Sequence, residues 1–311
     1  MHYEYIFYIK KEKMSNKQPE VYFYVPYADV LQVREDEEKY TYANGIVSRR
    51  KFLKSPLNYI GGKYKLLPQL IEFFPEKINT FVDLFSGGFN VGINVDCNKV
   101  ICNDMNTFII DLYKELYSKP IDETLNKITG RINEYGLSKE NEEAFKKFRD
   151  YYNKTKEPID LYTLSCYSFN YQFRFNNNKE YNNPFGRNRS QFSDNMKSNL
   201  ILFTEKLKSM NVEFLSKPFD KVDLSKLNSE DFVYCDPPYL ITTGSYNDGN
   251  RGFKDWKEEE EIQLYKVLDE LNKRNKEIAK KHKNGKTIEE LADEYYLTGY
   301  SIRRIIKKVD L

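Results

Sequence analysis

The sequence contains few of the residues that metal centres and disulfide frameworks require. Its 311 residues include two histidines, His2 and His282, and four cysteines that form no Cys-x-x-Cys pair. Zinc sites and disulfide-stapled folds depend on closely spaced cysteines and histidines. We therefore expect no metal site. Chemistry that relies on a histidine base would have only one residue near each end of the chain to use.

Long apolar runs are also missing. No run approaches the roughly 20 residues of a membrane-spanning helix. The first five residues lack the order of charged, apolar and small residues that marks a secretory signal. The sequence thus predicts a cytoplasmic protein with no membrane segment. The length and a 40% share of hydrophobic residues suit one large domain or about two ordinary ones.

Net charge is nearly absent, but the charge is unevenly placed. The chain has 49 basic and 47 acidic residues, a formal charge of +2. Basic residues are in excess in the stretches 48–65, 171–200 and 272–311, and the first of these contains no acid. Such basic stretches are typical of nucleic-acid contacts. The 26 tyrosines and 21 phenylalanines could stack on bases or simply fill a core, and composition alone favours the core.

A repeating α/β pattern begins after residue 47. The apolar run 80–85 predicts a buried strand that ends in Ser86-Gly87-Gly88, and a helix is expected from 91. A second predicted strand, 99–104, ends in Asp104, and a helix is expected over 107–117. Strand, glycine turn, helix and strand together predict a doubly wound α/β sheet.

An insert interrupts this pattern. Helices are expected over 121–135 and 139–153, followed by a stretch in which aromatic, amide and arginine residues alternate. The α/β pattern resumes with predicted strands at 212–215 and 232–235. We therefore assign 48–118 and 212–274 to one catalytic domain and 119–211 to an inserted, mostly helical domain.

Two further segments flank these domains. Residues 1–47 form an N-terminal extension whose role the sequence does not indicate. An amphipathic helix is expected over 255–274, followed by short helices at 276–283, 288–295 and 301–308. Helix, turn and helix within 275–311 predict a helix-turn-helix-like tail. A plain amphipathic hairpin that covers the sheet edge is the alternative.

The motif Asp236-Pro237-Pro238-Tyr239 directly follows the predicted strand 232–235. Two prolines cannot continue a strand ladder, so the chain must leave the sheet there. The Asp236 carboxylate and the Pro237 carbonyl could accept both N–H bonds of an amino group on a flat ring, while Tyr239 stacks on that ring. These groups suit chemistry on a planar amine, and they require no histidine.

The glycine turn and Asp104 suggest a nucleoside-bearing cofactor. Gly87 and Gly88 would let the backbone approach a ligand closely. Asp104, about 20 residues after the turn begins, lies where an acid meets ribose hydroxyls in such folds. Alone, the turn could be purely structural and Asp104 a solvated loop acid.

In this order, the motifs resemble the Dam-like family of DNA adenine-N6 methyltransferases. The matching stretches are 56–63, 81–88, 103–104, 183–187 and 236–239, and the resemblance covers roughly residues 51–269. It implies a Rossmann-like sheet, S-adenosyl-L-methionine as cofactor, and methyl transfer to a flipped adenine in double-stranded DNA. It also implies a monomer, with a cognate restriction endonuclease as functional partner.

The resemblance assigns roles to individual residues. Tyr59 stands where the family often has tryptophan, and Phe89 replaces a usual small residue. The expected catalytic residues are Asp236, Pro237, Pro238 and Tyr239. The expected cofactor-binding residues are Tyr59, Gly61, Gly62, Lys63, Asp83, Phe85, Gly87, Gly88, Asp104 and Asp236. The expected DNA-binding residues are Arg174, Asn177, Lys179, Arg187 and Arg189 in the insert and Arg303 and Arg304 in the tail.

The end of the chain departs from the family pattern. Family members continue through further strands after this motif, whereas the resemblance here is expected to stop after Asn275, which would leave the strand before Asp236 near a sheet edge. A catalytically impaired DNA-binding or regulatory remnant is therefore an alternative. Methylation of a protein glutamine or an RNA base is a second alternative, which Asp236 and the insert argue against.

Overall fold

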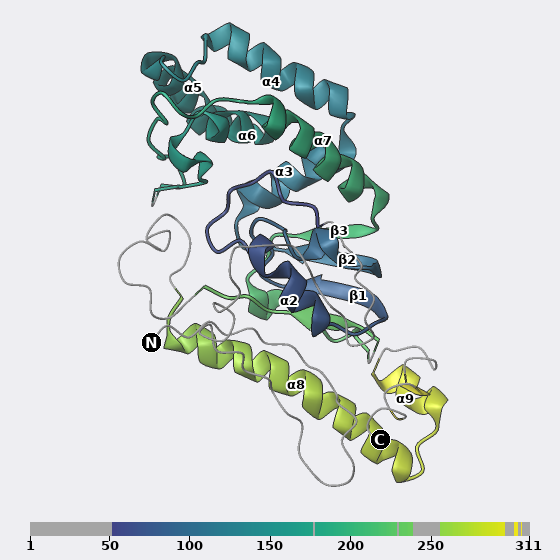
Figure 1. Ribbon diagram of the computed structural model, residues 1–311. Coiled ribbons are helices and arrows are strands. Elements are labelled where there is room, and N and C mark those ends of the chain that lie inside the picture. The colour runs from purple at the N-terminus through teal and green to yellow at the C-terminus, as the bar shows by residue number, and fades with distance from the viewer. Residues whose placement is uncertain are drawn as a thin grey trace.

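The structure is a computed structural model, and its described residues begin at Phe52 (Figure 1). They comprise residues 52–176, 178–228, 230–238, 256–295, 302, 303 and 306. The predicted N-terminal extension lies outside these ranges, as do Asn177, Tyr239 and Arg304. No helix within the ranges combines the length and apolar character needed to cross a membrane.

A parallel sheet forms the centre of the fold. Its four described strands are β1 (Ile78–Asp83), β2 (Cys97–Asn103), β3 (Val212–Leu215) and β4 (Phe232–Tyr234), in the order β3-β2-β1-β4. The predicted doubly wound, Rossmann-like α/β sheet is confirmed. Within the described residues β4 is an edge strand, as expected from the sequence.

Helices cover both faces of the sheet, as a parallel sheet requires. Side chains alternate along a strand, and in register they share a face across strands. Phe81, Val100 and Phe232 thus belong to a core with α2 (Leu67–Glu72) and α3 (Thr107–Ser118). Their neighbours Val82, Ile101 and Val233 face α8 (Glu258–Lys283) through Leu264 and Leu268. Figure 1 shows α8 along the side of the molecule opposite the insert.

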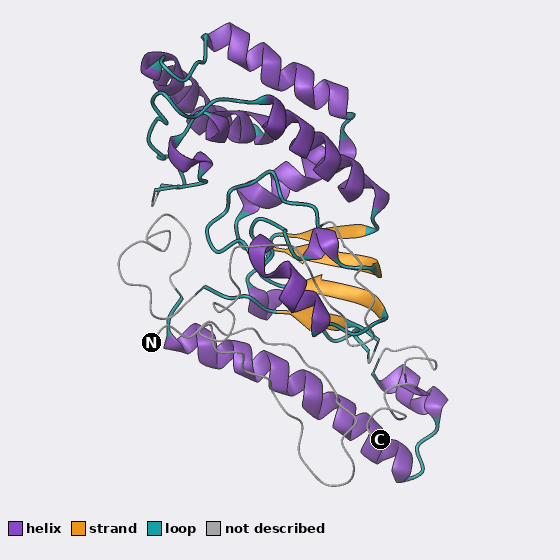
Figure 2. Cartoon of the chain, viewed as in Figure 1, coloured by secondary structure: helices purple, strands orange, loops and turns teal. Residues whose placement is uncertain are grey.

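The insert is mostly helical, as expected. Helix α4 (Ile121–Tyr135) has the predicted bounds, and α5 (Glu142–Thr155) begins after the Asn141 cap rather than at residue 139. Two further helices, α6 (Pro158–Cys166) and α7 (Asp194–Ser209), were not predicted (Figure 2). All but the first residue of α6 are buried, so its sequence carries no polar stripe that would reveal a helix.

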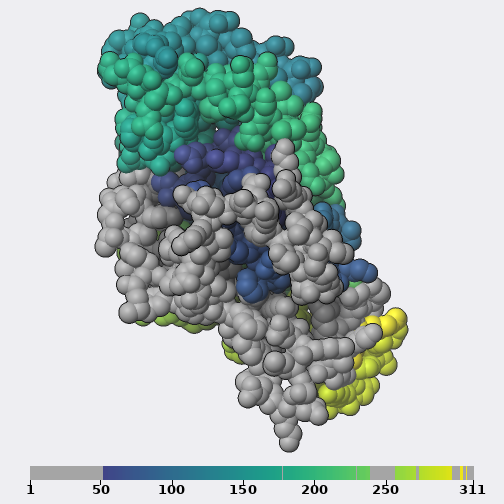
Figure 3. Space-filling model, in the orientation of Figure 1, coloured from purple at the N-terminus to yellow at the C-terminus, as the bar shows by residue number. Residues whose placement is uncertain are grey.

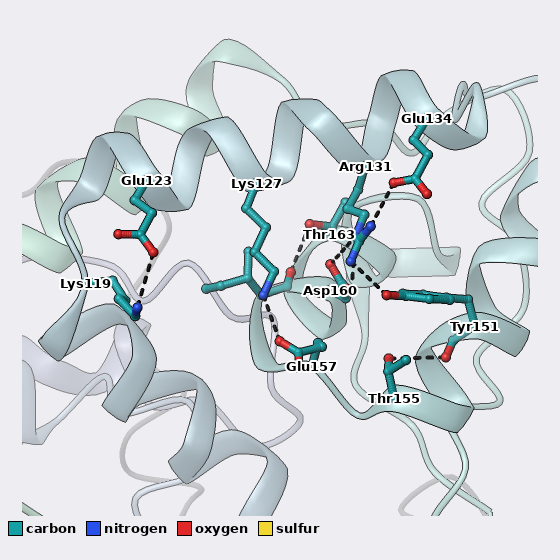
Figure 4. Close-up of polar contacts among 11 residues, drawn as sticks. Lys119, Glu123, Lys127, Arg131, Glu134, Tyr151, Thr155, Glu157, Asp160 and Thr163 are labelled. Atoms are coloured by element: carbon teal, nitrogen blue, oxygen red, sulfur yellow. Dashed lines mark hydrogen bonds and ion pairs between the residues drawn. The ribbon is translucent and has the colours of Figure 1, made fainter.

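A polar network joins the helices of the insert. The Arg131 guanidinium on α4 donates to the fully buried Asp160 carboxylate on α6 at 3.1 Å and to the Tyr151 hydroxyl on α5 at 2.9 Å (Figure 4). Lys127 pairs with Glu157 at 2.8 Å. Because Asp160 is charge-paired, its burial does not leave an isolated charge. The network fixes how α4, α5 and α6 pack.

The C-terminal helices differ from expectation in one respect. Helix α8 (Glu258–Lys283) is continuous, so the predicted break between residues 274 and 276 is wrong. No glycine or proline interrupts this stretch, and the helix ends only before Gly285, whose φ is 98°. Helix α9 (Ile288–Glu294) follows, capped by Thr287. A small core then joins Ile278, Leu291, Ile302 and Ile306.

The expected helix after the glycine turn is instead a single 3-10 turn, Gly92–Asn94. Phe89, at φ 56°, directs its fully buried ring against Tyr113, with ring centroids 5.7 Å apart. A Cβ added at Gly92 would lie 2.2 Å from Cε2 of that ring. Phe89 thus fills the core behind the turn, and Gly92 makes room for it.

Replacing Gly92 by alanine should therefore destabilise the fold by about 1–3 kcal/mol, because the buried Phe89 ring has no space to move into. Urea denaturation would measure the change. The matched control is Gly130→Ala in the interior of α4, where an added methyl meets no atom within 4 Å. That control should stabilise the chain by roughly 0.5–1 kcal/mol. Equal effects of the two substitutions would contradict the assignment.

Candidate active site

The carboxyl ends of β1, β2 and β4 bring the predicted acids to one edge of the sheet. Asp83 ends β1, Asp104 directly follows β2, and Asp236 lies two residues after β4. In open parallel sheets ligands bind at this edge. The negative charges of Asp236 and Asp104 both raise the pKa of Asp83, so the three carboxyls are within electrostatic reach of one another. Within the described ranges, no group of histidine, cysteine and acidic side chains could hold a metal ion.

Lys63 and Asp236 form a buried ion pair. Lys63 Nζ lies 2.9 Å from Asp236 Oδ2 and also donates to the Gly61 carbonyl at 2.9 Å. The two side chains are 5% and 14% exposed. Burial raises the pKa of Asp236, and the Lys63 ammonium opposes that rise. The pair therefore favours an ionised carboxylate at a site that would otherwise disfavour it.

The second carboxylate oxygen of Asp236 is buried and makes no hydrogen bond to any described residue. Buried acceptors are normally satisfied, so an exception calls for an explanation. Because Lys63 fixes the other oxygen, this one is held as an oriented acceptor beside Pro237. A ligand N–H group would satisfy it.

Asp104 fixes the glycine turn. Its Oδ2 accepts from the Gly87 backbone N–H and its Oδ1 from that of Asn106, both at 2.8 Å. The Tyr113 hydroxyl donates to the Gly87 carbonyl at 2.7 Å. Burial raises the pKa of Asp104, and the two N–H donors oppose that rise. Each oxygen keeps a lone pair with which it could also accept from a ligand.

Gly87 and Gly88 admit the Tyr59 ring. A Cβ at Gly87 would lie 3.0 Å from Tyr59 Cδ1, and one at Gly88 would lie 3.1 Å from Tyr59 Cβ. Gly87 also has φ 44°, which a side chain would strain. The structure thus brings together Tyr59 and the glycine turn, two predicted cofactor elements that lie almost 30 residues apart in the chain.

Asp83 is almost completely buried, at 1% exposure. Its Oδ2 accepts from the Gly92 backbone N–H at 3.1 Å. Burial raises the pKa of Asp83 to about 8, and the negative charges of Asp236 and Asp104 add to the rise. The carboxyl therefore holds its proton through neutral pH, and a cationic ligand beside it would favour the ionised form.

This pKa predicts a pH-dependent stability. Between about pH 4 and 8 the folded chain keeps the Asp83 proton that the unfolded chain loses, so stability falls as pH rises, by up to about 1.4 kcal/mol per pH unit. Asp83→Asn removes the titration while keeping an acceptor for Gly92. Melting temperatures of the ligand-free variant and wild type should coincide near pH 4, and the variant should melt higher at pH 8. A pH-independent difference would contradict the prediction.

An aromatic cluster lies beside the glycine turn on the α8 face. The Phe85 ring lies 5.6 Å from that of Phe219 and 5.5 Å from that of Trp256. The Trp256 indole N–H donates to Glu261 at 2.7 Å. Phe219 and Asn106 were not predicted as site residues, although an asparagine just before a predicted helix is a recognisable cap signal.

Four of the predicted DNA-binding residues of the insert are described, and they lie in and beside one turn-rich segment. Arg187 and Arg189 are exposed, and Arg187 pairs with Glu142. Lys179 is exposed with φ 59°. Arg174 is half-buried, and its Nε makes no hydrogen bond to any described residue. Arg303 is exposed.

Known proteins include a matching family and several relatives of this chain. Residues 59–310 match the model of the D12 class of N6 adenine-specific DNA methyltransferases. The chain is 55% identical over 276 residues to the type II methyltransferase M.FokI of Planomicrobium okeanokoites, covering 87% of this chain and 39% of that protein. It is 53% identical over 255 residues to the modification methylase StsI of Streptococcus sanguinis, covering 81% and 39%.

A more distant relative matches over most of its own length. The DNA adenine methylase of Escherichia coli (strain K12) is 30% identical over 204 residues, covering 64% of this chain and 68% of that protein. The chain spans only 39% of the length of the two more similar relatives. Because the family match runs to residue 310, the expectation that the resemblance stops after Asn275 is wrong.

Proposed function

The chain belongs to the D12 class of N6 adenine-specific DNA methyltransferases, and on this premise we propose that it methylates N6 of a flipped adenine at specific sites in double-stranded DNA. S-adenosyl-L-methionine is the proposed methyl donor. The observation that carries the proposal is the Asp236 carboxylate, which Lys63 holds through one oxygen while the other is a buried acceptor with no hydrogen bond to any described residue.

Asp236 would act on the amino group of the target base. The N6 lone pair of adenine is delocalised into the ring, so the nitrogen is a poor nucleophile. The free oxygen of Asp236 and the Pro237 carbonyl would accept its two N–H bonds and direct the lone pair outward. As the N–C bond forms and the sulfonium S–C bond breaks, N6 gains positive charge, which the Asp236 carboxylate stabilises. The excess proton would then pass from N6 to the Asp236 carboxylate that accepts its hydrogen bond, and from there to water.

The residues at the sheet edge fit the proposed cofactor. When bound, S-adenosyl-L-methionine supplies an activated methyl group on a sulfonium. Asp83 offers a buried carboxyl to the cationic methionine part, and Lys63 would reach its carboxylate. Asp104 would accept from the ribose hydroxyls, and the glycine turn with Tyr59 would border the nucleoside. Gly61, Gly62, Phe85 and Gly88 complete the proposed cofactor set.

DNA would be read by the insert. We propose that the domain division stands as the sequence predicts it, with residues 119–211 contacting the target through Arg174, Asn177, Lys179, Arg187 and Arg189. Arg303 and Arg304 would add contacts from the tail. Tyr239 would stack on the flipped base, offsetting about 1–3 kcal/mol of the cost of unstacking. The chain would act as a monomer in the cytoplasm, alongside a cognate restriction endonuclease.

Product analysis tests the proposal. Purified chain is incubated with tritiated S-adenosyl-L-methionine and unmethylated plasmid DNA, and the DNA is digested to nucleosides. We expect the label in N6-methyldeoxyadenosine, at a small set of sequence contexts when the sites are mapped. Unlabelled DNA would overturn the catalytic proposal, and cofactor and DNA binding without turnover would favour the catalytically impaired alternative. Label in parallel RNA or protein samples would favour the other alternative.

A further inference from the structure

The segment Phe169–Phe175 of the insert contacts Asn58, the residue directly before Tyr59 in the chain. The Asn58 side-chain amide donates to the Asn170 carbonyl at 2.6 Å, across 112 residues of chain. Asn58 also forms a parallel bridge with Gln172. In Figure 3 the start of the described chain, in purple, lies directly beneath the insert. The insert therefore contacts Asn58, which directly precedes Tyr59 in the chain, and Tyr59 packs on the glycine turn.

The same segment reaches Tyr59 from a second direction. The Phe175 ring stacks on that of Phe108, with centroids 4.8 Å apart and planes 19° apart. Phe108 lies in the first turn of α3, whose cap Asn106 places its amide 3.5 Å from the Tyr59 hydroxyl. Tyr59 is thus linked to the Phe169–Phe175 segment through Asn58 on one side and the start of α3 on the other.

The segment is held in an unusual backbone conformation. Asn170 and Tyr171 both have positive φ, at 53° and 56°. Such residues persist only where their surroundings hold them, and they cluster at switch regions. Here the Arg189 guanidinium donates to Asn170 Oδ1 at 2.8 Å, and the Tyr171 hydroxyl donates to the Arg189 carbonyl at 3.1 Å.

The arginine that holds this turn is open to solvent. Arg189 is exposed, and its guanidinium lies 5.0 Å from the centroid of the Phe169 ring, which is itself 42% exposed. A phosphate or base edge that bound Arg189 would compete with Asn170 for its N–H groups. The contact that stabilises the strained turn is therefore one that DNA could remove.

We infer that Asn58 is a positioning residue that couples DNA contact at the Phe169–Phe175 segment to the placement of Tyr59 in the cofactor site. The inference rests on the proposed function, which assigns Arg189 to DNA and Tyr59 to cofactor. When Arg189 turns to DNA, the turn relaxes, the Asn170 carbonyl moves and Asn58 moves with it. Linkage requires the reverse effect, so cofactor binding changes the stability of the turn.

Amide hydrogen exchange with S-adenosylhomocysteine as the probe tests the inference on the full chain. Saturating probe should slow exchange at residues 83–104, which reports occupancy of the cofactor site, and should slow exchange at 169–172 by about 5-fold or more, the lower range of typical coupling. Asn58→Asp keeps the size of the side chain but removes its N–H donor. In this variant the probe should still slow exchange at 83–104, whereas the slowing at 169–172 should fall below about 2-fold. Asn126→Asp, on the outer surface of α4, is the matched control.

The possible outcomes separate the inference from its premise. If the probe slows exchange at 83–104 but not at 169–172 in wild type, the inference is overturned and the proposed cofactor site stands. The same conclusion follows if Asn58→Asp shows slowing at 169–172 equal to that of wild type. No change at 83–104 in wild type would overturn the proposed cofactor site, and the inference with it. As the reciprocal measurement, unmethylated plasmid DNA should change the dissociation constant of the probe about 5-fold or more in wild type and less than about 2-fold in Asn58→Asp.

Discussion

Asp236→Asn should reduce the rate of methyl transfer by at least about 10³-fold, with a much smaller effect on cofactor affinity. The amide keeps the shape of the carboxylate and can still accept one hydrogen bond. It lacks the negative charge that stabilises the cationic N6 as the N–C bond forms, and such charge interactions count most in a buried site. Single-turnover methylation of plasmid DNA at saturating cofactor would measure the loss.

Two comparisons make this result specific. Asp122→Asn, on the exposed side of α4, should methylate at the wild-type rate. Asp236→Asn removes the negative charge that pairs with the buried Lys63 ammonium, which costs stability, so the circular dichroism and melting temperature of the variant must show that it is folded under the assay conditions. A folded Asp236→Asn protein within about 10-fold of the wild-type rate would exclude Asp236 as the acceptor for the target amino group.

Lys63→Met should shift the pH dependence of the reaction. In wild type the Lys63 ammonium opposes the rise in the Asp236 pKa that burial causes. Without it the pKa of Asp236 rises further, so the active ionised form is lost at a higher pH. The acid limb of the pH–rate profile should therefore shift to higher pH. The rate at pH 6 should fall by about 10²-fold or more, which is a larger loss than at pH 8.5.

The profile must be measured at saturating cofactor, because Lys63 is also proposed to bind the cofactor carboxylate. Asp83, whose pKa of about 8 is raised partly by the charge of Asp236, titrates in both proteins, so the shift of the acid limb reports the coupled pair of carboxyls. Lys65→Met, exposed two residues away, should leave the profile unchanged. If the acid limb lies at the same pH in Lys63→Met and in wild type, the ion pair does not control the ionisation of Asp236.

The sheet and its acids could be predicted from the sequence because each strand carries a local signal. The apolar runs before Asp83, Asp104 and Asp236 mark buried parallel strands, and topology alone then brings the three acids to one edge. Resemblance added the residues of the 56–63 stretch, which no periodicity singles out. The fully buried helix α6 was missed because it lacks a polar face, and α8 was divided because local patterning does not show where a helix continues without a breaker.

Other features of the site depend on contacts between distant residues. Nothing in the local sequence indicates that Lys63 pairs with Asp236, since 173 positions separate them, or that Gly87 is required partly to admit the Tyr59 ring. The same holds for Phe89, whose bulk suggests interference at the glycine turn but whose ring is buried in the core. Such pairings are decided by packing, which a single sequence does not reveal.

The unbroken helix α8 has a mechanical consequence. Near one end Leu264 and Leu268 pack on the sheet, and near the other Ile278 packs in the small core with α9. At 1.5 Å per residue its 26 residues span about 39 Å as one stiff rod. The continuous helix therefore fixes the orientation of the tail about the helix axis relative to the sheet. One residue added between Leu268 and Ile278 would turn the tail by about 100° about the helix axis, whereas a flexible linker would absorb the change.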